Sequence, residues 1–511
     1  MKKKVMALVL SSLMAVGLLA GCASAPAAAP AASEPAAAVE EAGEAAPEAA
    51  ADTADLPKVS MDIICGSIPS ETPSIEAALT EITKEYGFRV ELIPIEIGNS
   101  GTQLNLLLSG GDDTLDVYWS GVGGLTFNTV VNAGQALELD EYVAPYLDDL
   151  KSALGENVVN AGYINGKLMG LGRLLDQAST PVYNLRADIA AQYGYKNGDK
   201  INLELLTELF EKIRADYPDT PLIGPMNGAP NIGDCRVDAL SNRLGVLPEY
   251  GQSETVIDYY SSDYFAELVD YFTKWKEMGC YIPDILNTTD APSDYIPSGK
   301  CFGCFASHFS AEMNGIWASQ NYGCDMASLQ IYDSAVAITP GAFYHINPAC
   351  KNPDKAATWL WLMATNKDVV NLLINGIEGQ DYQVLEDGTF AYMDGKDVAT
   401  TGWCMGYSWC ALNSSISTPF NYPADYYEQM LNANKTANQS KAFGCMFDLT
   451  GVADEVTACT NVVNQYFNAL EGGAVDDMAG AYEQFKADLQ TAGIDKIVAA
   501  KQEQLDAFLG K

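Results

Sequence analysis

The chain has 511 residues, 48% of them hydrophobic, and its 67 acidic residues outnumber the 29 basic ones to give a net charge of −38. This length accommodates two or three domains with cores of their own. The charge argues against nucleic acid as a partner, because nucleic-acid binding depends on Lys and Arg that neutralise phosphates. The two histidines are too few for a three-histidine zinc site.

Residues 1–21 have the pattern of an export signal. Three lysines precede an apolar run over residues 5–20, which is shorter than the roughly 20 residues that a membrane-spanning helix needs. The sequence "LAGC" at residues 19–22 resembles the bacterial lipobox, in which the signal is cut before the cysteine and the thiol receives a lipid. We therefore predict that Cys22 is lipidated and becomes the first residue of the mature protein. The alternative is an ordinary secretory signal with a cysteine there by chance.

Residues 22–56 are predicted to be a disordered tether. Residues 23–55 consist mainly of Ala, Pro and Glu and contain no Lys, Arg or aromatic residue. Such a segment cannot bury enough apolar surface to offset the entropy lost on ordering.

Strands and helices are predicted to alternate between residues 57 and 121. The segments "KVSMDIICGS", "RVELIPIEI" and "LDVYWSG" are predicted strands, and helices are predicted from Thr72-Pro73 to Gly87 and over "TQLNLLLSGG". This order indicates a parallel sheet with right-handed crossovers, whose ligands lie beyond the carboxyl ends of the strands. The residues that follow those ends are candidate ligand contacts: Gly66, Ser67, Trp119 and Ser120.

The second half of the chain is predicted to contain more helix. Two helices run from Asn352-Pro353 to Asn375-Gly376, and another covers residues 452–470 before Gly472-Gly473. Cys301 and Cys304 lie in "KCFGCFASHF", which is predicted to be a strand, so that residues three apart point to opposite faces. We expect neither a disulfide nor a metal site there, and most of the twelve cysteines are interpreted as small buried apolar groups.

No catalytic motif is identified. The Gly-x-Ser-x-Gly elbow and the phosphate loop are absent from the sequence. Aromatic residues at loop positions, among them Trp119, Trp317, Trp403 and Trp409, suit the apolar C–H faces of sugar rings. The alternative for each of them is core packing, which is expected outright for Trp359 and Trp361.

Several stretches together resemble a known family. "LLSGGDDTLDVYWSG", "YINGKLMGLGRLLDQASTPVYNLRADI" and "INPACKNPDKAATWLWLMA", following a lipobox and a tether, are similar to family 1 of the bacterial extracellular solute-binding proteins. These proteins are the capture subunits of ABC importers, and most carry sugars or oligosaccharides. "LLINGIEGQDY" and the C-terminal stretch from "FDLTGVADEV" onward resemble the LipO-type branch.

The resemblance implies an α/β fold of the two-lobed periplasmic-binding-protein-like kind (type II), with a sheet flanked by helices in each lobe and a hinge between the lobes. We expect lobe one to contain residues 57–177 and 342–402, and lobe two residues 178–341 and 403–511 with the C-terminal helices. The crossing segments are expected near residues 176–180, 339–343 and 400–409. The ligand contacts expected besides the four at the strand ends are Asp176, Gln177, Ser307, His308, Phe343, Tyr344, Trp403 and Trp409.

The expected function is that of a lipid-anchored, extracellular solute-binding subunit of an ABC importer. It is expected to capture a sugar or oligosaccharide by closure of its lobes, to act as a monomer with the permease subunits, and to need no cofactor, metal or catalytic residue. The expected location is the outer face of the cell membrane in a bacterium without an outer membrane. Alternatives are a surface lipoprotein glycosidase with paired carboxylates, and a carbohydrate-binding protein, adhesin or scaffold without a transport role.

Overall fold

The computed structural model describes residues 53–109, 115–122, 125–164, 166–226, 229–288, 290–336, 342–397, 400–403, 408–420 and 422–511. The predicted signal, Cys22 and the tether up to residue 52 lie outside the described residues. Within the described ranges, no helix has both the length and the apolar character needed to cross a membrane.

The first sheet has the strand order β2-β1-β3-β11-β6. As predicted, β1 (Lys58–Cys65) is parallel to β2 (Arg89–Glu96) and to β3 (Val117–Ser120). β11 (Phe343–Ile346) joins β3 and β6 (Leu171–Gly172) in antiparallel fashion. The parallel strands β1 and β3 therefore end at the same edge of the sheet, as expected for a ligand-binding rim.

Both faces of the first sheet are covered, which explains why β1 is buried at every position from Val59 onward. Val59, Met61 and Ile63 pack in one core with α1 (Thr72–Thr83) and α12 (Pro353–Thr365), whereas Ile64 packs in another with α2 (Ser100–Ser109) and α3 (Phe127–Asn132). α1 has a proline in its first turn, and after a short 3-10 turn the chain leaves it at Gly87 with φ of 77°, as its sequence predicts. The remaining elements of this part are α4 (Asp140–Val143), α5 (Leu147–Leu154), α6 (Glu156–Asn160), β4 (Tyr163–Ile164), β5 (Lys167–Leu168) and α13 (Lys367–Asn375).

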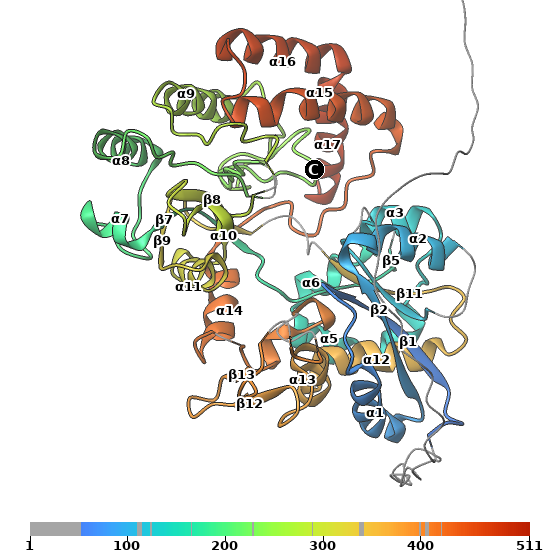
Figure 1. Ribbon diagram of the computed structural model, residues 1–511. Coiled ribbons are helices and arrows are strands. Elements are labelled where there is room, and N and C mark those ends of the chain that lie inside the picture. The colour runs from blue at the N-terminus through green and yellow to red at the C-terminus, as the bar shows by residue number, and fades with distance from the viewer. Residues whose placement is uncertain are drawn as a thin grey trace, which may run out of the picture. The chain divides into compact units, whose positions relative to one another are not determined.

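The second sheet is built around β7 (Ala178–Arg186). β7 pairs in antiparallel fashion with β8 (Gly303–His308), β9 (Met326–Gln330) and β10 (Ala335–Val336), and β14 (Asn438–Gln439) extends the sheet beyond β10. Its helices are α7 (Ala187–Gln192), α8 (Leu203–Asp216), α9 (Asp263–Glu277), α10 (Pro292–Tyr295), α11 (Ala311–Tyr322), α14 (Tyr426–Thr436), α15 (Ala453–Glu471), α16 (Met478–Ala492) and α17 (Ile494–Phe508). The C-terminal helices α15 and α16 pack beside α9 in its largest core (Figure 1). A hairpin of β12 (Tyr382–Val384) and β13 (Phe390–Tyr392) forms a separate small sheet.

Residues after 402 correct the expected boundary of lobe two. Trp403, Cys410 and Leu412 pack in the core of the first sheet. The Trp403 Nε1 donates to the carbonyl oxygen of Leu373 (3.2 Å), and the Leu174 N–H donates to that of Leu412 (2.8 Å). The described part of the third crossing thus belongs physically to the first sheet, and the expected division after residue 402 does not follow the core.

Among the ten described cysteines no disulfide is formed, and seven are buried. Cys301 and Cys304 are both buried, but the expected reason for their separation was wrong. β8 begins only at Gly303, so Cys301 is not on the strand, and both thiols pack in one small core. Burial raises the pKa of both thiols, which keeps them protonated and unreactive at neutral pH.

Candidate functional site

Residues 173–177 join β6 to β7, and side chains from three distant parts of the chain gather around them. The Arg173 guanidinium lies 5.5 Å from the centre of the Trp119 ring. Asp176 is close enough to Tyr422 and Tyr426 for its charge to act on both phenols. This short connection therefore brings together a carboxylate, a guanidinium and aromatic rings.

Trp119 is held at the end of β3 by its backbone. Its N–H donates to Asp62 Oδ1 at 3.0 Å, and its half-buried ring packs against both cores of the first sheet. Burial raises the pKa of Asp62 to about 7, and the hydrogen bond from the Trp119 N–H opposes this rise. The Trp119 Nε1 is buried and has no hydrogen-bond partner in the described chain. The indole thus has an N–H that contacts with the described residues leave unused.

Arg173 is buried next to the Trp119 ring. Its Nε donates to the carbonyl oxygen of Ala411 at 3.3 Å, which fixes the guanidinium against the chain that follows Trp409. Burial lowers its pKa, while the electrostatic influence of Tyr344, Cys410 and Asp176 opposes that shift. Because an arginine stays charged in proteins, it supplies a fixed cation beside the Trp119 face.

Asp176 combines solvent access with a dense surrounding of protein. Its side chain is exposed, yet desolvation by the neighbouring groups raises its pKa to about 6, and Arg173 opposes the shift. The consequence of this shift for stability is small, because water still reaches the carboxylate and screens it. An ionised carboxylate in this position accepts hydrogen bonds from a ligand.

An aromatic cluster lies beside Asp176. The rings of Tyr422 and Tyr426 are stacked with centroids 4.3 Å apart, and Tyr426 contacts Phe309 edge-on at 5.2 Å. The centres of the His308 and Tyr426 rings are 6.4 Å apart. Burial lowers the pKa of His308 to about 4, so the His308 ring is neutral at pH 7. Its Nδ1 is buried without a partner among the residues placed by the structure.

Gln177 and α14 are tied together by one side chain. Asn434 Oδ1 accepts from the backbone N–H groups of Gln177 (2.8 Å) and Ala178 (2.9 Å), and its Nδ2 donates to the Leu175 carbonyl (2.8 Å). The Gln177 Nε2 is buried and finds no acceptor in the described residues. The helix that begins with Tyr426 is therefore fastened to the connection that carries Asp176.

The arrangement suits a polyhydroxylated ligand. Buried polar groups in folded proteins are normally satisfied, so three nitrogens left unsatisfied by the described residues, on Trp119, Gln177 and His308, are candidates to bond to a ligand. Aromatic faces and a carboxylate accompany them, which is the chemistry that sugar C–H faces and hydroxyls require. No group of His, Cys, Asp and Glu with the geometry of a metal site occurs among the described residues.

The group of side chains around residues 173–177 includes four of the predicted contacts: Trp119, Asp176, Gln177 and His308. Gly66 and Ser67 are exposed just beyond the end of β1. Trp409 is half-buried, but its Nε1 donates to the Ile64 carbonyl at 2.7 Å. Ser307 is exposed on β8 and lines a separate cavity.

The other predicted contacts are corrected to core positions. Ser120, Phe343, Tyr344 and Trp403 are all buried. Ser120 Oγ lies 2.8 Å from His345 Nε2, and the Tyr344 hydroxyl donates to the Trp409 carbonyl at 2.8 Å. Ser120, Phe343 and Tyr344 are buried because β11 inserts beside β3. Trp403 packs separately in the core of the first sheet.

Sequence reasoning missed Arg173, Tyr422 and Tyr426. The tyrosines lie in "YPADYY" at residues 422–427, where a proline and turn-forming residues separate aromatic rings. Applying the criterion for loop aromatics to tyrosine as well as tryptophan would have found them. No local signal singles out Arg173.

Comparison with known proteins shows what the chain resembles. Residues 441–510 match the family model described as a domain of unknown function, DUF3502. A protein of Streptococcus pneumoniae called carbohydrate ABC transporter substrate-binding protein is 24% identical over 474 residues, which cover 90% of this chain and 92% of that protein.

Solved structures with the same fold include the N-glycan transport solute binding protein NgtS from Streptococcus pneumoniae, with a TM-score of 0.76 and 21% identity over 89% of this chain and 99% of that one. An HMO-binding solute binding protein from Bifidobacterium longum infantis has a TM-score of 0.61 and 14% identity over the same shares of the two chains. The predicted resemblance to the solute-binding proteins of ABC importers is confirmed, as is the two-lobed α/β fold.

Proposed function

We propose that this chain, with the fold of the extracellular solute-binding proteins, captures an oligosaccharide and delivers it to the permease subunits of an ABC importer. The captured sugar is released unchanged, so the protein is not an enzyme. Cys22 carries a lipid that holds the mature protein at the outer face of the cell membrane. The protein works as a monomer without cofactor or metal.

The observation that carries the proposal is the set of unused polar atoms beside aromatic faces. Trp119 Nε1, Gln177 Nε2 and His308 Nδ1 are buried and have no partner in the described part of the chain. Desolvated donors and acceptors cost free energy unless a ligand satisfies them. Sugar hydroxyls donate and accept at once, and the stacked rings of Tyr422 and Tyr426 offer the apolar face that a pyranose ring covers.

Glycans containing mannose and N-acetylglucosamine are the first ligands to test. Structures of NgtS with Man1GlcNAc and with Man5GlcNAc share this fold at TM-scores of 0.68 and 0.65. At 21–22% identity the likeness supports the choice of probes, while the site residues named above support the ligand class.

Closure of the two lobes is the proposed means of capture. The segment 176–180 leads from the first sheet into β7 and carries Asp176 and Gln177, so a hinge motion there moves site residues together with the lobes. In this proposal lobe one contains residues 57–177 and 342–402, together with Trp403 and residues 410–412, which pack in the core of the first sheet. Lobe two contains the other residues from 178 onward.

The test is a thermal-shift screen of mono- and oligosaccharides followed by calorimetry. A ligand at 100 times its dissociation constant stabilises the folded protein by about 2.7 kcal/mol. We expect Tyr426→Ala to weaken binding at least tenfold. Tyr86→Ala, which removes an exposed tyrosine that contacts Trp361, should leave it unchanged. The proposal fails when no glycan shifts the melting temperature or when both variants bind like wild type.

Two further measurements separate the rival functions. Chromatography of the sugar after incubation should return it intact, whereas products would identify a glycosidase. Small-angle scattering should show a smaller radius of gyration with ligand than without. An unchanged radius would favour an adhesin or scaffold without a closing cleft.

A further inference from the structure

A cavity of about 270 Å³ lies in the part of the protein built on the second sheet. β7, β8 and β10 contribute Ser179, Pro181, Ser307, Ala335 and Val336 to its wall. The rest of its lining comes from residues 231–250, within a long connection between α8 and α9 that forms no named helix or strand. None of the lining residues belongs to the group of side chains around residues 173–177 that forms the candidate site.

The loop that lines the cavity is strained. Seven described residues other than glycine have a positive φ, and six of them lie in this loop: Asn231, Leu240, Ser241, Arg243, Glu249 and Tyr250. Such conformations are costly and persist only where the surroundings hold them, and they concentrate at ligand clamps and functional sites. Three of the six, Asn231, Arg243 and Tyr250, line the cavity itself.

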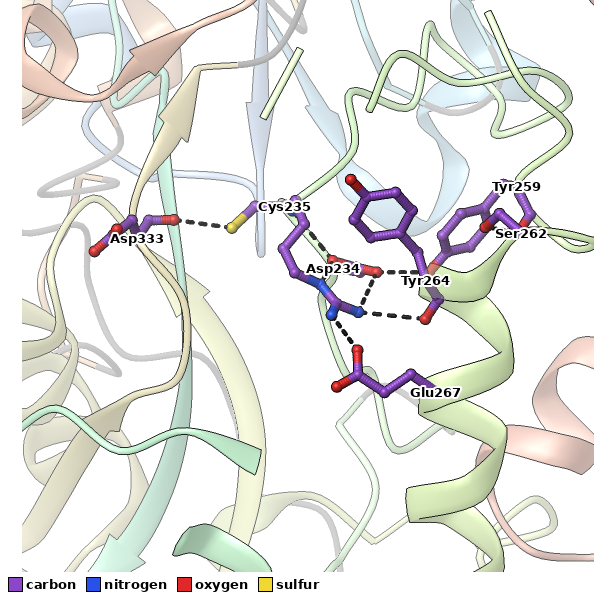
Figure 2. A network of polar contacts seen from close by, with 8 residues as sticks. Asp234, Cys235, Tyr259, Ser262, Tyr264, Glu267 and Asp333 are labelled. Carbon is purple, nitrogen blue, oxygen red and sulfur yellow. Dashed lines mark hydrogen bonds and ion pairs between the residues drawn. The ribbon is translucent and has the colours of Figure 1, made fainter. Parts of the chain in front are cut away.

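Contacts from α17 and from the chain at and just before α9 hold the loop at two places. On α17, the fully buried Lys501 Nζ donates to the carbonyl oxygens of Leu240 (2.7 Å) and Gly245 (3.1 Å) and to Asn242 Oδ1 (2.7 Å), so all three of its N–H groups are used. Near α9, the Tyr259 hydroxyl donates to Asp234 Oδ2 at 3.2 Å (Figure 2).

Arg236 adds further contacts between the loop and the chain at α9. Its Nε and Nη2 donate to the two Asp234 oxygens at 2.9 and 3.0 Å, and its Nη1 donates to Glu267 of α9. Asp234 and Arg236 are thus fully engaged with each other and with α9. They support the wall of the cavity instead of offering it unused groups.

Two other charged side chains in the lining keep unused capacity. Asp238 is 7% exposed, and its Oδ1 accepts from the Leu240 N–H at 3.1 Å, whereas its buried Oδ2 forms no hydrogen bond of normal geometry with the described residues. The Ser440 hydroxyl is near the carboxylate and opposes the rise in the Asp238 pKa that burial causes. Arg243 is half-buried with its guanidinium 5.8 Å from the centre of the Phe467 ring. The Arg243 backbone N–H donates to the Ala239 carbonyl at 2.8 Å, but no hydrogen bond or ion pair joins its guanidinium to the portion of the chain that the structure describes.

These groups favour a neutral, hydroxyl-bearing ligand. An anion would meet Asp234 and Asp238, and a cation would meet Arg243. A sugar hydroxyl donates to Asp238 and accepts from Arg243, which satisfies both without a net charge. The volume is below the 300 to 1,000 Å³ typical of sites for drug-sized ligands, so it suits one ring of a larger molecule.

The chain itself links this cavity to the candidate site. Gln177 directly precedes β7, and Ser179 is two residues further on, so their side chains project to the same side. Ser307, which lines the cavity, is paired with Pro181, whereas the next residue, His308 of the candidate site, points to the opposite face of β8. A ligand that contacts Gln177 therefore needs little further length to reach the cavity.

We propose that this cavity is a subsite that binds a single neutral sugar residue of the captured oligosaccharide through Asp238 and Arg243. The inference rests on the proposed function, because it assigns one part of the same ligand. Binding of that residue uses the strained loop that Lys501 and the Asp234–Arg236 pair hold in place.

The test compares two nearly isosteric variants in calorimetry with Man1GlcNAc, Man5GlcNAc and any longer glycan that wild type binds. Asp238→Asn keeps the acceptor for Leu240 and removes the unused carboxylate oxygen. Arg243→Gln removes a guanidinium that bonds to no described residue. We expect each variant to melt near the wild-type temperature and to lose tenfold or more in affinity for at least one glycan. The affinity gained from a longer glycan should also shrink.

Asp270→Asn is the matched control, because Asp270 is exposed on α9 and is absent from the cavity lining. It should bind like wild type. Folded Asp238→Asn and Arg243→Gln variants with wild-type affinity for every glycan would overturn the subsite. Should Asp238→Asn not fold, Arg243→Gln decides alone. A wild-type protein that binds no glycan would instead overturn the proposed function.

Discussion

Two tryptophans in this protein differ in what their indole nitrogens meet. The Trp403 side chain is 2% exposed, and its Nε1 donates to the Leu373 carbonyl within the core. The Trp119 ring packs against two cores, but its Nε1 has no partner in the described chain. An alanine at residue 119 would therefore remove core packing together with any ligand contact.

Phenylalanine separates these two effects. Trp119→Phe keeps most of the ring and removes an N–H that no described residue uses, so the ligand-free melting temperature should change little. Affinity for the glycan should fall about five- to tenfold, the worth of one hydrogen bond. Trp403→Phe should do the reverse, with a lower melting temperature and unchanged affinity. Equal affinity of Trp119→Phe and wild type in calorimetry would remove this nitrogen from the site.

Asp176 should make binding depend on pH. Its pKa is raised to about 6, so the carboxylate is ionised at pH 7.5 and largely protonated at pH 5. Because an ionised acceptor forms the stronger hydrogen bond, wild-type affinity should rise about tenfold between pH 5 and 7.5. Asp176→Asn should bind with one affinity across this range. A wild-type profile as flat as that of the variant would contradict the assignment.

The same shift has a defined sign for stability. Because the folded protein holds the Asp176 proton more tightly than the unfolded chain, this group's contribution to stability falls as pH rises from about 4 to 6. Solvent screening of this exposed side chain limits the effect to about 1 kcal/mol or less. Asp176→Asn should therefore be slightly more stable than wild type above pH 6 in chemical denaturation.

At the scale of elements, one residue of α14, Asn434, fastens the helix to the connection between the two sheets. Asn434 forms three hydrogen bonds with residues 175–178, and α14 presents Tyr426 at its first position. The helix and the connection between the sheets therefore move as one. A change at Asn434 should reach the ligand through the position of Tyr426, although Asn434 itself is only the fastening.

Asn434→Ala is expected to lower the free energy of unfolding by about 2 kcal/mol, because two backbone N–H groups lose their acceptor. Glycan affinity should fall with it as the aromatic cluster loses its fixed place. Asn432→Ala, on the exposed side of the same helix, controls for helix propensity and should change neither quantity. Denaturant titration and calorimetry measure the two effects, and equal behaviour of the two variants would refute the role of Asn434.

At the scale of the whole molecule, the proposed role depends on attachment to the cell surface. Cys22 lies outside the described residues, so this prediction rests on the lipobox at residues 19–22. A single lipid chain contributes about 0.8 kcal/mol per buried CH₂ group. Cys22→Ser should release folded protein into the medium, with the glycan affinity of the anchored form. Retention of the variant on the cell, measured by fractionation, would show that another element anchors the protein.

Local patterns in the sequence predicted the elements that depend on near neighbours. The alternation of β1, α1, β2, α2 and β3 follows from periodicity, from the proline of α1 and from Gly87, and α15 ends at Gly472 as its pattern predicts. The predicted parallel order of β1 and β3, which the structure confirms, is sufficient to place Trp119 at the rim of the sheet. The family resemblance and the proposed ligand class also rest on residues visible in the linear chain.

Only the tertiary structure decided which of those residues share a place. β11 enters the first sheet more than 200 residues after β3, and this insertion buries Phe343 and Tyr344, which the sequence favoured as ligand contacts. Tyr422 meets Asp176 across some 246 residues of chain, so no local pattern records their proximity. Periodicity reports which face of an element is apolar, whereas a binding site depends on which side chains remain unsatisfied once distant elements have packed.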